Sequence, residues 1–194
     1  MKIVFATSNK NKAAEIAKLL PEHFSILTLA DINQTEEIPE TSPTIEGNAI
    51  QKADYITSHY QLNCFADDTG LEVKCLNGAP GVKSARYAGE QRNDNDNIDM
   101  VLKNMENKQD RSARFKTIIA LNIDGNQHIF EGIIEGSIRR ERTGENGFGY
   151  DSIFEPENCG RTFAEMTMEE KNAHSHRARA FHKMSTFLNS LKSK

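Results

Sequence analysis

The chain has 194 residues, and its 24 lysines and arginines against 28 aspartates and glutamates give a formal net charge of −4. Its composition, 37% hydrophobic and 27% charged, is typical of a folded globular protein rather than a disordered one. The three cysteines have no CxxC spacing, which argues against a disulfide scaffold and against structural zinc. The mild acidity argues against binding along a nucleic-acid backbone. No apolar run is long enough to span a membrane.

The first part of the chain alternates between strand and helix patterns. A short buried strand is predicted over residues 2–6 and a second strand over 25–29, and apolar residues at helical spacing predict a helix over 13–20 that Pro21 ends. The amino terminus turns polar too soon for the core of a signal peptide, so we expect a cytoplasmic protein.

A second helix is predicted after Ser42-Pro43, with the serine as its N-cap and the proline at its first position. Residues 63–66 then run apolar into Asp67-Asp68-Thr69-Gly70, and a strand pattern resumes over 71–75. We expect the acidic segment to be a turn at the end of a strand.

The second half of the chain changes character. A helix is predicted over 98–105, and two long strands, 114–123 and 128–138, flank the turn dipeptide Asp124-Gly125. A glycine-rich loop follows over 144–151, and the chain ends in helices. The order of elements predicts a mixed α/β fold.

Residues 7–12 lie at a strand-to-helix turn, where the N–H groups of the first helical turn favour a phosphate group. The turn carries hydroxyl, amide and ammonium donors in the order Thr7, Ser8, Asn9, Lys10, Asn11, Lys12. It lacks the glycines of a P-loop, and an ordinary helix cap explains the same residues.

Adjacent carboxylates at Asp67 and Asp68 repel each other unless a cation or hydrogen-bond donors compensate them. Mg²⁺ commonly takes one or two carboxylates and completes its shell with water and substrate phosphate, so this pair suits it. A solvated acidic turn is the plainer interpretation.

Two aromatic residues, Phe148 and Tyr150, lie between glycines, where they could stack on a flat ring such as a nucleic base. His174 and His176 are two residues apart, and on a helix such a spacing does not place both on one metal. A charged helix face is the simpler explanation of residues 171–177.

Taken in order, these motifs resemble the inosine triphosphate pyrophosphatase family, which acts on noncanonical purine triphosphates, and its bacterial dITP/XTP pyrophosphatase branch in particular. The matching segments are Thr7-Ser8-Asn9-x-x-Lys12-x-x-Glu15, Glu46-Gly47-Asn48-Ala49-x-x-Lys52-Ala53, Phe65-Ala66-Asp67-Asp68-Thr69-Gly70-Leu71, Gly78-Ala79-Pro80-Gly81-x-x-Ser84-Ala85-Arg86-Tyr87, Gly147-Phe148-Gly149-Tyr150-Asp151 and Glu165-Met166-Thr167-x-Glu169-Glu170-Lys171-x-x-x-Ser175-His176-Arg177. Thr69 stands where the family usually has serine, and Ser152 where it usually has proline.

The resemblance implies one domain over residues 1–194, with an elongated mixed β-sheet flanked by helices and two lobes around a central cleft. It implies a homodimer and Mg²⁺-dependent hydrolysis of ITP, dITP, XTP and dXTP to the monophosphate and pyrophosphate. It implies no nucleic-acid or membrane partner.

The resemblance also assigns roles to residues. Asp68 is expected both to activate water as the base and to bind the metal. Glu40 is the second metal ligand, with Asp67 as an alternative. The residues expected to bind phosphate are the turn 7–12 with Lys12 at its end, Lys52, Thr69 and Lys171. Those expected to bind the base are Phe148, Gly149, Tyr150, Asp151, His176 and Arg177.

Two other functions remain open at this point. One is a Maf-type pyrophosphatase, which has a similar fold and acts on modified pyrimidines or methylated bases. The other is a nucleotide-binding module without catalytic activity, which a missing carboxylate would favour.

One structural prediction follows from spacing. On a continuous helix, His176 and Arg177 would lie about 140° and 240° around the axis from Lys171 and would point away from it. If all three bind one ligand, the helix begun by the capping box at Thr167 must end near residues 171–172. A new helix must then begin with Ser175 as its N-cap.

Overall fold

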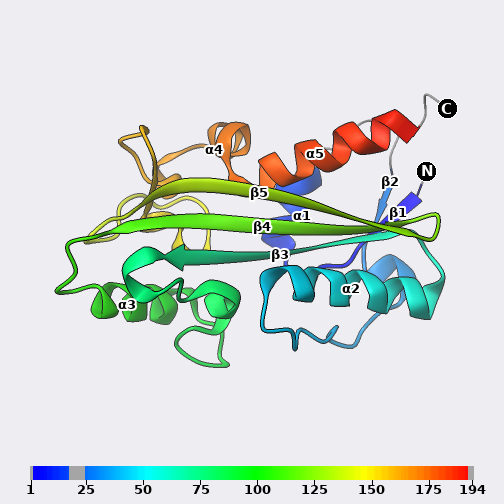
Figure 1. Cartoon of the computed structure of the whole chain (residues 1–194), viewed down its shortest axis with the longest axis horizontal. Helices are drawn as coiled ribbons and strands as arrows, with labels where there is room; N and C mark the ends of the chain where they lie inside the picture. The colour runs from blue at the N-terminus through cyan, green and yellow to red at the C-terminus, as the bar shows by residue number, and fades with distance from the viewer. Residues whose placement is uncertain (1, 18–24, 192–194) are drawn as a thin grey trace. The chain divides into compact units, whose positions relative to one another are not determined.

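The strands of the chain form one mixed sheet. A computed structural model describes residues 2–17 and 25–191, and its sheet has the strand order β2-β1-β3-β4-β5-β6 (Figure 1). The strands are β1 (Lys2–Phe5), β2 (Ser25–Leu27), β3 (Cys64–Val73), β4 (Ser112–Ile123), β5 (Asn126–Ile138) and β6 (Phe154–Pro156). Strand β1 pairs in parallel with both β2 and β3, whereas β5 and β6 are antiparallel. The predicted mixed α/β architecture is confirmed.

Helices precede or follow most of these strands. The α-helices are α1 (Lys10–Ala17), α2 (Ile45–Tyr60), α3 (Asp94–Asn104), α4 (Met168–His174) and α5 (His176–Leu191). Short 3₁₀ helices lie between them as η1 (Ala30–Ile32), η2 (Lys74–Leu76), η3 (Gly81–Arg86), η4 (Gly149–Ser152) and η5 (Phe163–Glu165). The part of the predicted first helix beyond residue 17 lies outside the described residues. No helix among residues 2–17 and 25–191 has the length and hydropathy needed to cross a membrane.

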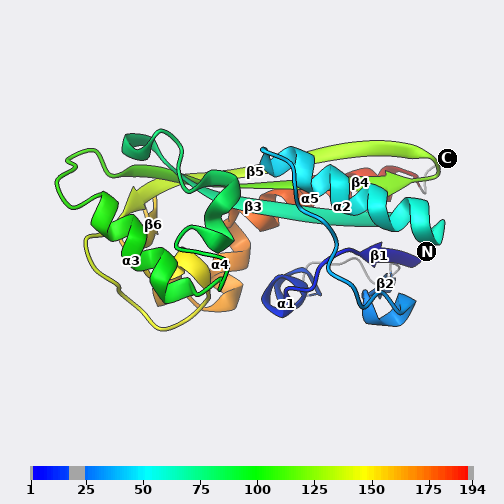
Figure 2. The same ribbon diagram turned by 90° about the horizontal axis from the view of Figure 1, so that it is seen from below.

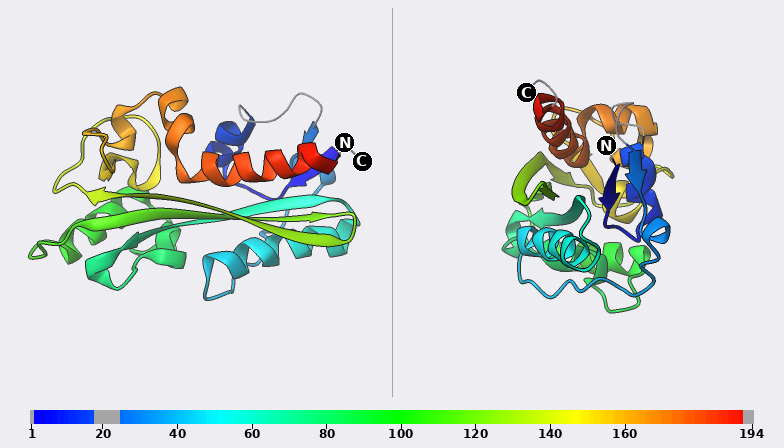
Figure 3. Two further views of the ribbon diagram at one scale, coloured as in Figure 1. Left: turned by 45° about the horizontal axis from the view of Figure 1, so that its top comes forward. Right: turned by 90° about the vertical axis from the view of Figure 1, so that its right-hand side faces the viewer.

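The chain divides into two compact units, and β3, β4 and β5 each contribute residues to both. The first unit comprises Met1–Asp68, Thr117–Gly132 and Arg177–Lys194. In it, α2 and α5 cover opposite faces of the strands, which the end view in Figure 3 shows. Figure 2 shows β1 beside β2 and the chain turning from β1 into α1.

The core of the first unit is apolar on the α1 and α5 side of the sheet. Phe5 and Phe65 stack with ring centroids 4.5 Å apart, and Phe181 of α5 meets Phe65 edge-on. The buried hydrophobic residues of this core are Ile3, Phe5, Ile16, Phe65, Ile119, Leu121, Ile123, Ala180, Phe181, Met184 and Leu188. These residues fix where β3 and the first turn of α5 present their polar groups.

The second unit comprises Thr69–Lys116 and Ile133–His176, and it has its own core. Three phenylalanine rings meet in that core: Phe115 contacts Phe154 at 4.7 Å between ring centroids, and Phe154 contacts Phe163 at 5.4 Å. Around them pack Leu71, Val73, Ile98, Val101, Met105, Ala113, Ile134, Ile138, Tyr150, Ile153 and Met166.

The acidic segment Asp67–Gly70 is not the turn that the sequence predicted. It lies within β3, which runs without interruption from Cys64 to Val73. A buried strand tolerates these carboxylates because neighbouring elements supply cations and donors to them, which a single sequence does not display. A smaller correction concerns α2, whose N-cap is Thr44, with its hydroxyl accepting the N–H of Gly47, rather than Ser42.

The predicted break between the last two helices is confirmed. Helix α4 ends at His174, Ser175 has extended backbone angles (φ −66°, ψ 156°), and α5 begins at His176. The first helix therefore continues two residues further than expected. The capping box is confirmed too, because the Thr167 hydroxyl accepts the Glu170 N–H and the Glu170 carboxylate accepts the Thr167 N–H.

The hairpin prediction is also confirmed, with slightly longer strands. Strands β4 and β5 are neighbours in the sheet and are joined by Asp124 and Gly125 at φ values of 50° and 77°. Two consecutive positive φ values are what a type I′ hairpin turn requires.

Candidate active site

The turn between β1 and α1 is organised by two of its own side chains. The Asn9 carboxamide oxygen accepts the N–H groups of Asn11 (2.9 Å) and Lys12 (3.1 Å), so Asn9 is the N-cap of α1. The Thr7 hydroxyl accepts the Asn9 N–H at 3.2 Å. The side chains of Ser8, Lys10 and Asn11 are exposed. The cap fixes the direction in which the turn presents Lys12.

Asp67 is the centre of a buried ion network. Its side chain is 1% exposed, and its Oδ2 atom lies 3.0 Å from Lys12 Nζ and 3.4 Å from Arg177 Nε. Arg177 Nη1 also contacts Glu15 Oε2, and the Arg177 side chain is 2% exposed. The arginine therefore links a carboxylate of α1 to a carboxylate of β3.

The network changes the pKa values of its members in opposite directions. Burial alone would raise the pKa of Asp67, but the cations of Lys12, Arg177 and Lys52 outweigh it and lower the pKa to about 2. Burial lowers the pKa of Lys12, against the attraction of Asp67. For Arg177, burial acts to lower the pKa, and the neighbouring Glu15 and Asp67 carboxylates reverse this and raise it.

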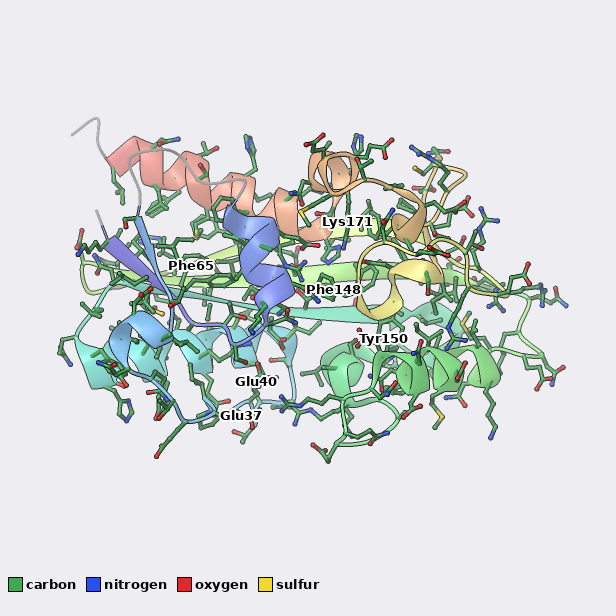
Figure 4. The ribbon with its side chains drawn as sticks, turned by 180° about the vertical axis from the view of Figure 1, so that it is seen from behind. Glu37, Glu40, Phe65, Phe148, Tyr150 and Lys171 are labelled. Atoms are coloured by element: carbon green, nitrogen blue, oxygen red, sulfur yellow. The ribbon has the colours of Figure 1, made fainter. Side chains whose placement is uncertain are left out.

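Asp68 meets a different set of partners. The Asn48 amide donates to Asp68 Oδ2 at 3.3 Å, and its own oxygen accepts the Ser42 N–H at 2.9 Å. One turn further along α2, Lys52 Nζ contacts Glu40 Oε1, which lies on the loop before the helix (Figure 4). Burial lowers the pKa of Lys52, but the carboxylates of Asp68, Glu40 and Asp67 reverse this and raise it.

The backbone of Gly47 in α2 lies close to the Ser42 side chain of that loop. A Cβ atom at residue 47 would lie 1.9 Å from the Ser42 hydroxyl oxygen and 2.8 Å from the Ser42 Cβ, so a larger residue would push the loop away from the helix. The approach allows Asn48 to bind the loop and Asp68 at once.

Asp67 and Asp68 point to opposite faces of β3 because side chains alternate along a strand. Asp67 meets α1 and α5, whereas Asp68 meets α2. The adjacent carboxylates thus avoid the repulsion that their sequence positions suggest. Asp67 is held by Lys12 and Arg177, and both Asp68 and Glu40 act on Lys52, so Asp68 and Glu40 stay the predicted metal ligands, with Asp67 as the alternative.

We call seven residues the charged cluster: Lys12, Glu15, Glu40, Lys52, Asp67, Asp68 and Arg177. Four carboxylates against three cations leave it with a formal charge of 3 − 4 = −1. A divalent cation would change this to +1, which favours a polyphosphate. No group of three or more His, Cys, Asp or Glu side chains in residues 2–17 and 25–191 could hold a metal by itself. Two carboxylates nevertheless suffice for Mg²⁺ that keeps water and phosphate ligands, so the donor set fits it.

The second unit presents what we call the aromatic loop, residues 147–151. Asp151 Oδ2 accepts the N–H of Phe148 at 2.9 Å and closes a tight turn on its own loop. Gly147 has a φ of 79°, and a Cβ atom there would lie 2.1 Å from the Asp151 carboxylate. Glycine at 147 is therefore required both for the backbone angle and for the approach of Asp151.

Lys171 joins α4 to this loop. Its Nζ atom lies 2.6 Å from Asp151 Oδ2, and both side chains are 5% exposed. The same ammonium lies 4.7 Å from the centroid of the Phe148 ring and 5.6 Å from that of Phe163 (Figure 4). An ion pair and cation–π contacts thus fix the loop against the core.

Two further residues of this unit are buried. His176 stacks on Phe115 with ring centroids 4.6 Å apart and planes 16° apart. The Tyr150 hydroxyl donates to the Ser84 carbonyl at 2.8 Å. Burial raises the pKa of Tyr150, with smaller contributions from Tyr87 and Asp94, so this hydroxyl stays a hydrogen-bond donor.

The structure thus separates the predicted site residues into two groups. Those in the first unit are Thr7, Ser8, Asn9, Lys10, Asn11, Lys12, Glu40, Lys52, Asp68 and Arg177, and those in the second are Thr69, Phe148, Gly149, Tyr150, Asp151, Lys171 and His176. Lys171, expected to bind phosphate, lies against Asp151 and Phe148 of its own unit. Arg177, expected to read the base, is paired with Glu15 and Asp67. Their ligand-binding roles stay predictions.

No role was predicted for Asn48 or Glu15 from the sequence. Both lie within segments that carry the family resemblance, and this was the one feature of the sequence that pointed to them. Asn48 sits on the buried face of α2, four residues before Lys52, which helical spacing places on the same side.

Comparisons with known proteins agree with one another. The model of the Ham1 family matches residues 3–187. A dITP/XTP pyrophosphatase of Flavobacterium johnsoniae is 58% identical over 99% of this chain and 100% of its own length, and one of Bacillus subtilis is 44% identical over 95% and 96%. The structure of a HAM1 protein from Coxiella burnetii superposes with a TM-score of 0.91 at 40% identity, covering 98% of this chain and 99% of that one.

Proposed function

Because this chain belongs to the Ham1 family, we propose that it hydrolyses ITP, dITP, XTP and dXTP to the monophosphate and pyrophosphate. The full-length relatives named dITP/XTP pyrophosphatases support this activity. The single observation that carries the proposal is the charged cluster. In it, Asp68 of β3 and Glu40 of the loop before α2 both lie close to Lys52 of α2. Such a site would keep deaminated purines out of DNA and RNA.

The difficulty of the reaction is electrostatic, since an anionic or electron-rich nucleophile must approach an anionic phosphorus atom. In the proposed step, the oxygen of a water molecule attacks the α-phosphorus and the bond from that phosphorus to the α,β-bridging oxygen breaks. Asp68 accepts the proton from water, and pyrophosphate leaves with the electron pair. The Asn48 amide fixes the Asp68 carboxylate for this task.

Cations of the charged cluster neutralise the phosphate chain. Lys12 is aimed by the capped β1–α1 turn, and Lys52 is held beside Glu40. Glu40 and Asp68 would hold Mg²⁺, which when bound supplies further neutralisation of phosphate charge and a lowered pKa for water. Arg177 and Glu15 keep Asp67 in place and thereby keep Lys12 in place.

The aromatic loop binds the base in this proposal. Phe148 is half-buried and is held over Lys171, so its ring is a preformed stacking surface. A 6-oxo purine presents an acceptor where adenine presents a donor, and a donor aimed at that position would leave itself unpaired against adenine. His176, Arg177 and the N–H groups of the loop are the candidates for that donor.

The two alternative functions have less support. A binding module without activity would be favoured by loss of a carboxylate, yet both Asp68 and Glu40 are present. No observation favours the activity of a Maf-type pyrophosphatase over that of the relatives named dITP/XTP pyrophosphatases. Homodimer formation, a cytoplasmic location and the lack of nucleic-acid or membrane partners stay predictions.

A substrate panel tests the proposal. Pyrophosphate release, read with a coupled inorganic pyrophosphatase, is measured for dITP, XTP, dUTP, 5-methyl-UTP and ATP with Mg²⁺. We expect dITP and XTP to be hydrolysed at least about 10²-fold more efficiently than ATP, since an unpaired donor discriminates strongly. Preference for the two pyrimidines would favour the Maf-type function, and binding of dITP without turnover of any substrate would favour the module.

A further inference from the structure

The first residue of α3 touches the middle of the aromatic loop. The Gly149 N–H donates to Asp94 Oδ2 at 2.8 Å, and both residues belong to the second unit. Asp94 lies 55 positions before Gly149 in the chain, and none of the motifs that carry the family resemblance includes it. Asn93, the N-cap of α3, fixes the start of the helix and hence the place of Asp94.

The ends of the loop have other anchors. Asn146 donates its N–H to the Ala164 carbonyl at 3.0 Å and its amide to the Met166 carbonyl at 3.2 Å. On the other side, Asp151 is bound by Lys171. Between these anchors, Gly149 has a φ of 58°, a backbone angle that glycine adopts and leaves easily. The Asp94 contact restrains that glycine, which directly follows Phe148.

A hydrogen bond from a backbone N–H to a carboxylate is charge-assisted, and such bonds are about twice as strong as neutral ones. The bond fixes both the position of the Gly149 peptide and its direction. Phe148 and Tyr150 flank this peptide, so a change in it alters where the Phe148 ring points.

We propose that Asp94 is a positioning residue for substrate binding: by accepting the Gly149 N–H, it holds the aromatic loop with the Phe148 ring in place for the base. This inference rests on the proposed function, because it assigns the base to that ring. Asp94 itself touches no substrate, and its effect reaches the ligand through the loop backbone.

The chain offers a matched control. Asp96 lies in the same first turn of α3, is exposed like Asp94 and interacts with the same helix dipole, but its carboxylate accepts from the Gln91 amide at 3.2 Å rather than from the loop. Asp94→Ala and Asp96→Ala therefore remove the same charge from the same helix end. Only the first releases Gly149.

The conservative variant separates the hydrogen bond from the charge. In Asp94→Asn the side-chain oxygen still accepts an N–H, although without charge assistance. We expect Asp94→Ala to raise KM for ITP about tenfold with kcat changed less than about threefold, the size expected for one charge-assisted bond. Asp94→Asn should recover most of the loss, and Asp96→Ala should stay within about twofold of the parent.

A second readout needs no substrate. The chain has no tryptophan, so Phe148→Trp introduces a single tryptophan at the loop, which can be excited selectively at wavelengths where tyrosine does not absorb. In this background, acrylamide quenching should increase with Asp94→Ala, return toward the parent with Asp94→Asn and be unchanged with Asp96→Ala. Melting temperatures of all variants show that each one folds.

The two readouts distinguish the two claims. If the parent does not hydrolyse ITP, the proposed function fails, and increased quenching with Asp94→Ala still supports the anchoring of the loop. If the parent is active and Asp94→Ala changes neither quenching nor KM beyond Asp96→Ala, the inference is overturned. It is also overturned if quenching rises while KM stays the same, because the loop position would then be irrelevant to binding.

Discussion

The charged cluster and the aromatic loop are held in place by different forces. In the cluster, buried carboxylates and cations compensate one another, and Asp67 and Arg177 are almost completely excluded from solvent. In the loop, hydrogen bonds to backbone N–H groups and one ion pair, Lys171–Asp151, fix a glycine-rich segment. Removing a cation of the cluster should leave buried carboxylates uncompensated, and so should removing Lys171 from Asp151, whereas losing a hydrogen bond such as that between Asp94 and Gly149 should only loosen the loop.

The difference indicates a division of labour. In the proposed function, the charges that act at the reacting phosphorus lie on strand β3, on helices packed against it and, for Glu40, on the loop before α2. The groups proposed to contact the base lie on a loop whose glycines permit unusual backbone angles. Substitutions in the cluster should therefore change turnover or folding, and substitutions in the loop should change affinity.

The largest effect is expected for Asp68→Asn. Loss of the base should lower kcat for ITP about 10³-fold or more, while the amide keeps the size of the side chain and its hydrogen bond to Asn48. Steady-state hydrolysis of ITP measures this. Asp124→Asn, the same change in the exposed β4–β5 turn, serves as the control and should keep the parent kcat. Near-normal turnover by Asp68→Asn would remove Asp68 from the chemistry.

Arg177→Met tests whether the cluster is structural as well as chemical. It leaves Glu15 and Asp67 buried with one cation fewer, so the free energy of unfolding should fall by about 3 kcal/mol or more. Urea unfolding measures the change, and Arg140→Met, at an exposed position just after β5, should cost about 0.5 kcal/mol or less. Equal losses in both variants would mean that the buried pairs add nothing to stability.

Phe148→Ala tests the loop. Stacking of one base on an aromatic ring contributes about 1–3 kcal/mol, so KM for ITP should rise about tenfold while kcat stays within about threefold. Phe148→Tyr keeps the ring and should remain close to the parent. A fall in kcat with unchanged KM would instead place Phe148 with the catalytic groups and would break the division of labour.

The smallest effect is expected for Tyr150→Phe, which removes the hydrogen bond to the Ser84 carbonyl. The free energy of unfolding should decrease by about 1 kcal/mol, and KM for ITP should rise by about twofold, since Tyr150 is itself part of the aromatic loop. Tyr60→Phe removes a similar bond to Gln34 in the first unit and should cost similar stability without any change in KM. Identical KM values for the two variants would show that Tyr150 only stabilises the fold.

Much of the fold could be predicted from local patterns. The β4–β5 hairpin follows from Asp124-Gly125 between two alternating segments, a short-range pattern that a sequence displays directly. The break before α5 was predicted from the condition, implied by the family resemblance, that Lys171, His176 and Arg177 bind one ligand. The break is confirmed, and the shared ligand stays a prediction. The boundary of α4 was less predictable, because the last turn of a helix costs little to extend.

The course of β3 could not be predicted from local patterns. Asp67-Asp68-Thr69-Gly70 has the composition of a turn, and only Lys12, Arg177 and Asn48, distant in sequence, make it stable inside a sheet. The same holds for the role of Asp94, because no local pattern in the sequence indicates its contact with Gly149. In both cases the structure depends on residues that are distant in the chain, and a single sequence does not show which residues these are.

The most direct test of the division of labour is the affinity of ITP for two variants in which the loss of Asp68 makes turnover slow. Isothermal titration calorimetry measures the binding of ITP, in the presence of Mg²⁺, to Asp68→Asn and to the double variant Asp68→Asn/Phe148→Ala. The account predicts that Asp68→Asn binds ITP with a Kd close to the KM of the parent and that the added Phe148→Ala weakens binding about tenfold. If Asp68→Asn by itself abolishes binding, or if Phe148→Ala leaves the Kd unchanged, chemistry and base binding are not divided between the charged cluster and the aromatic loop.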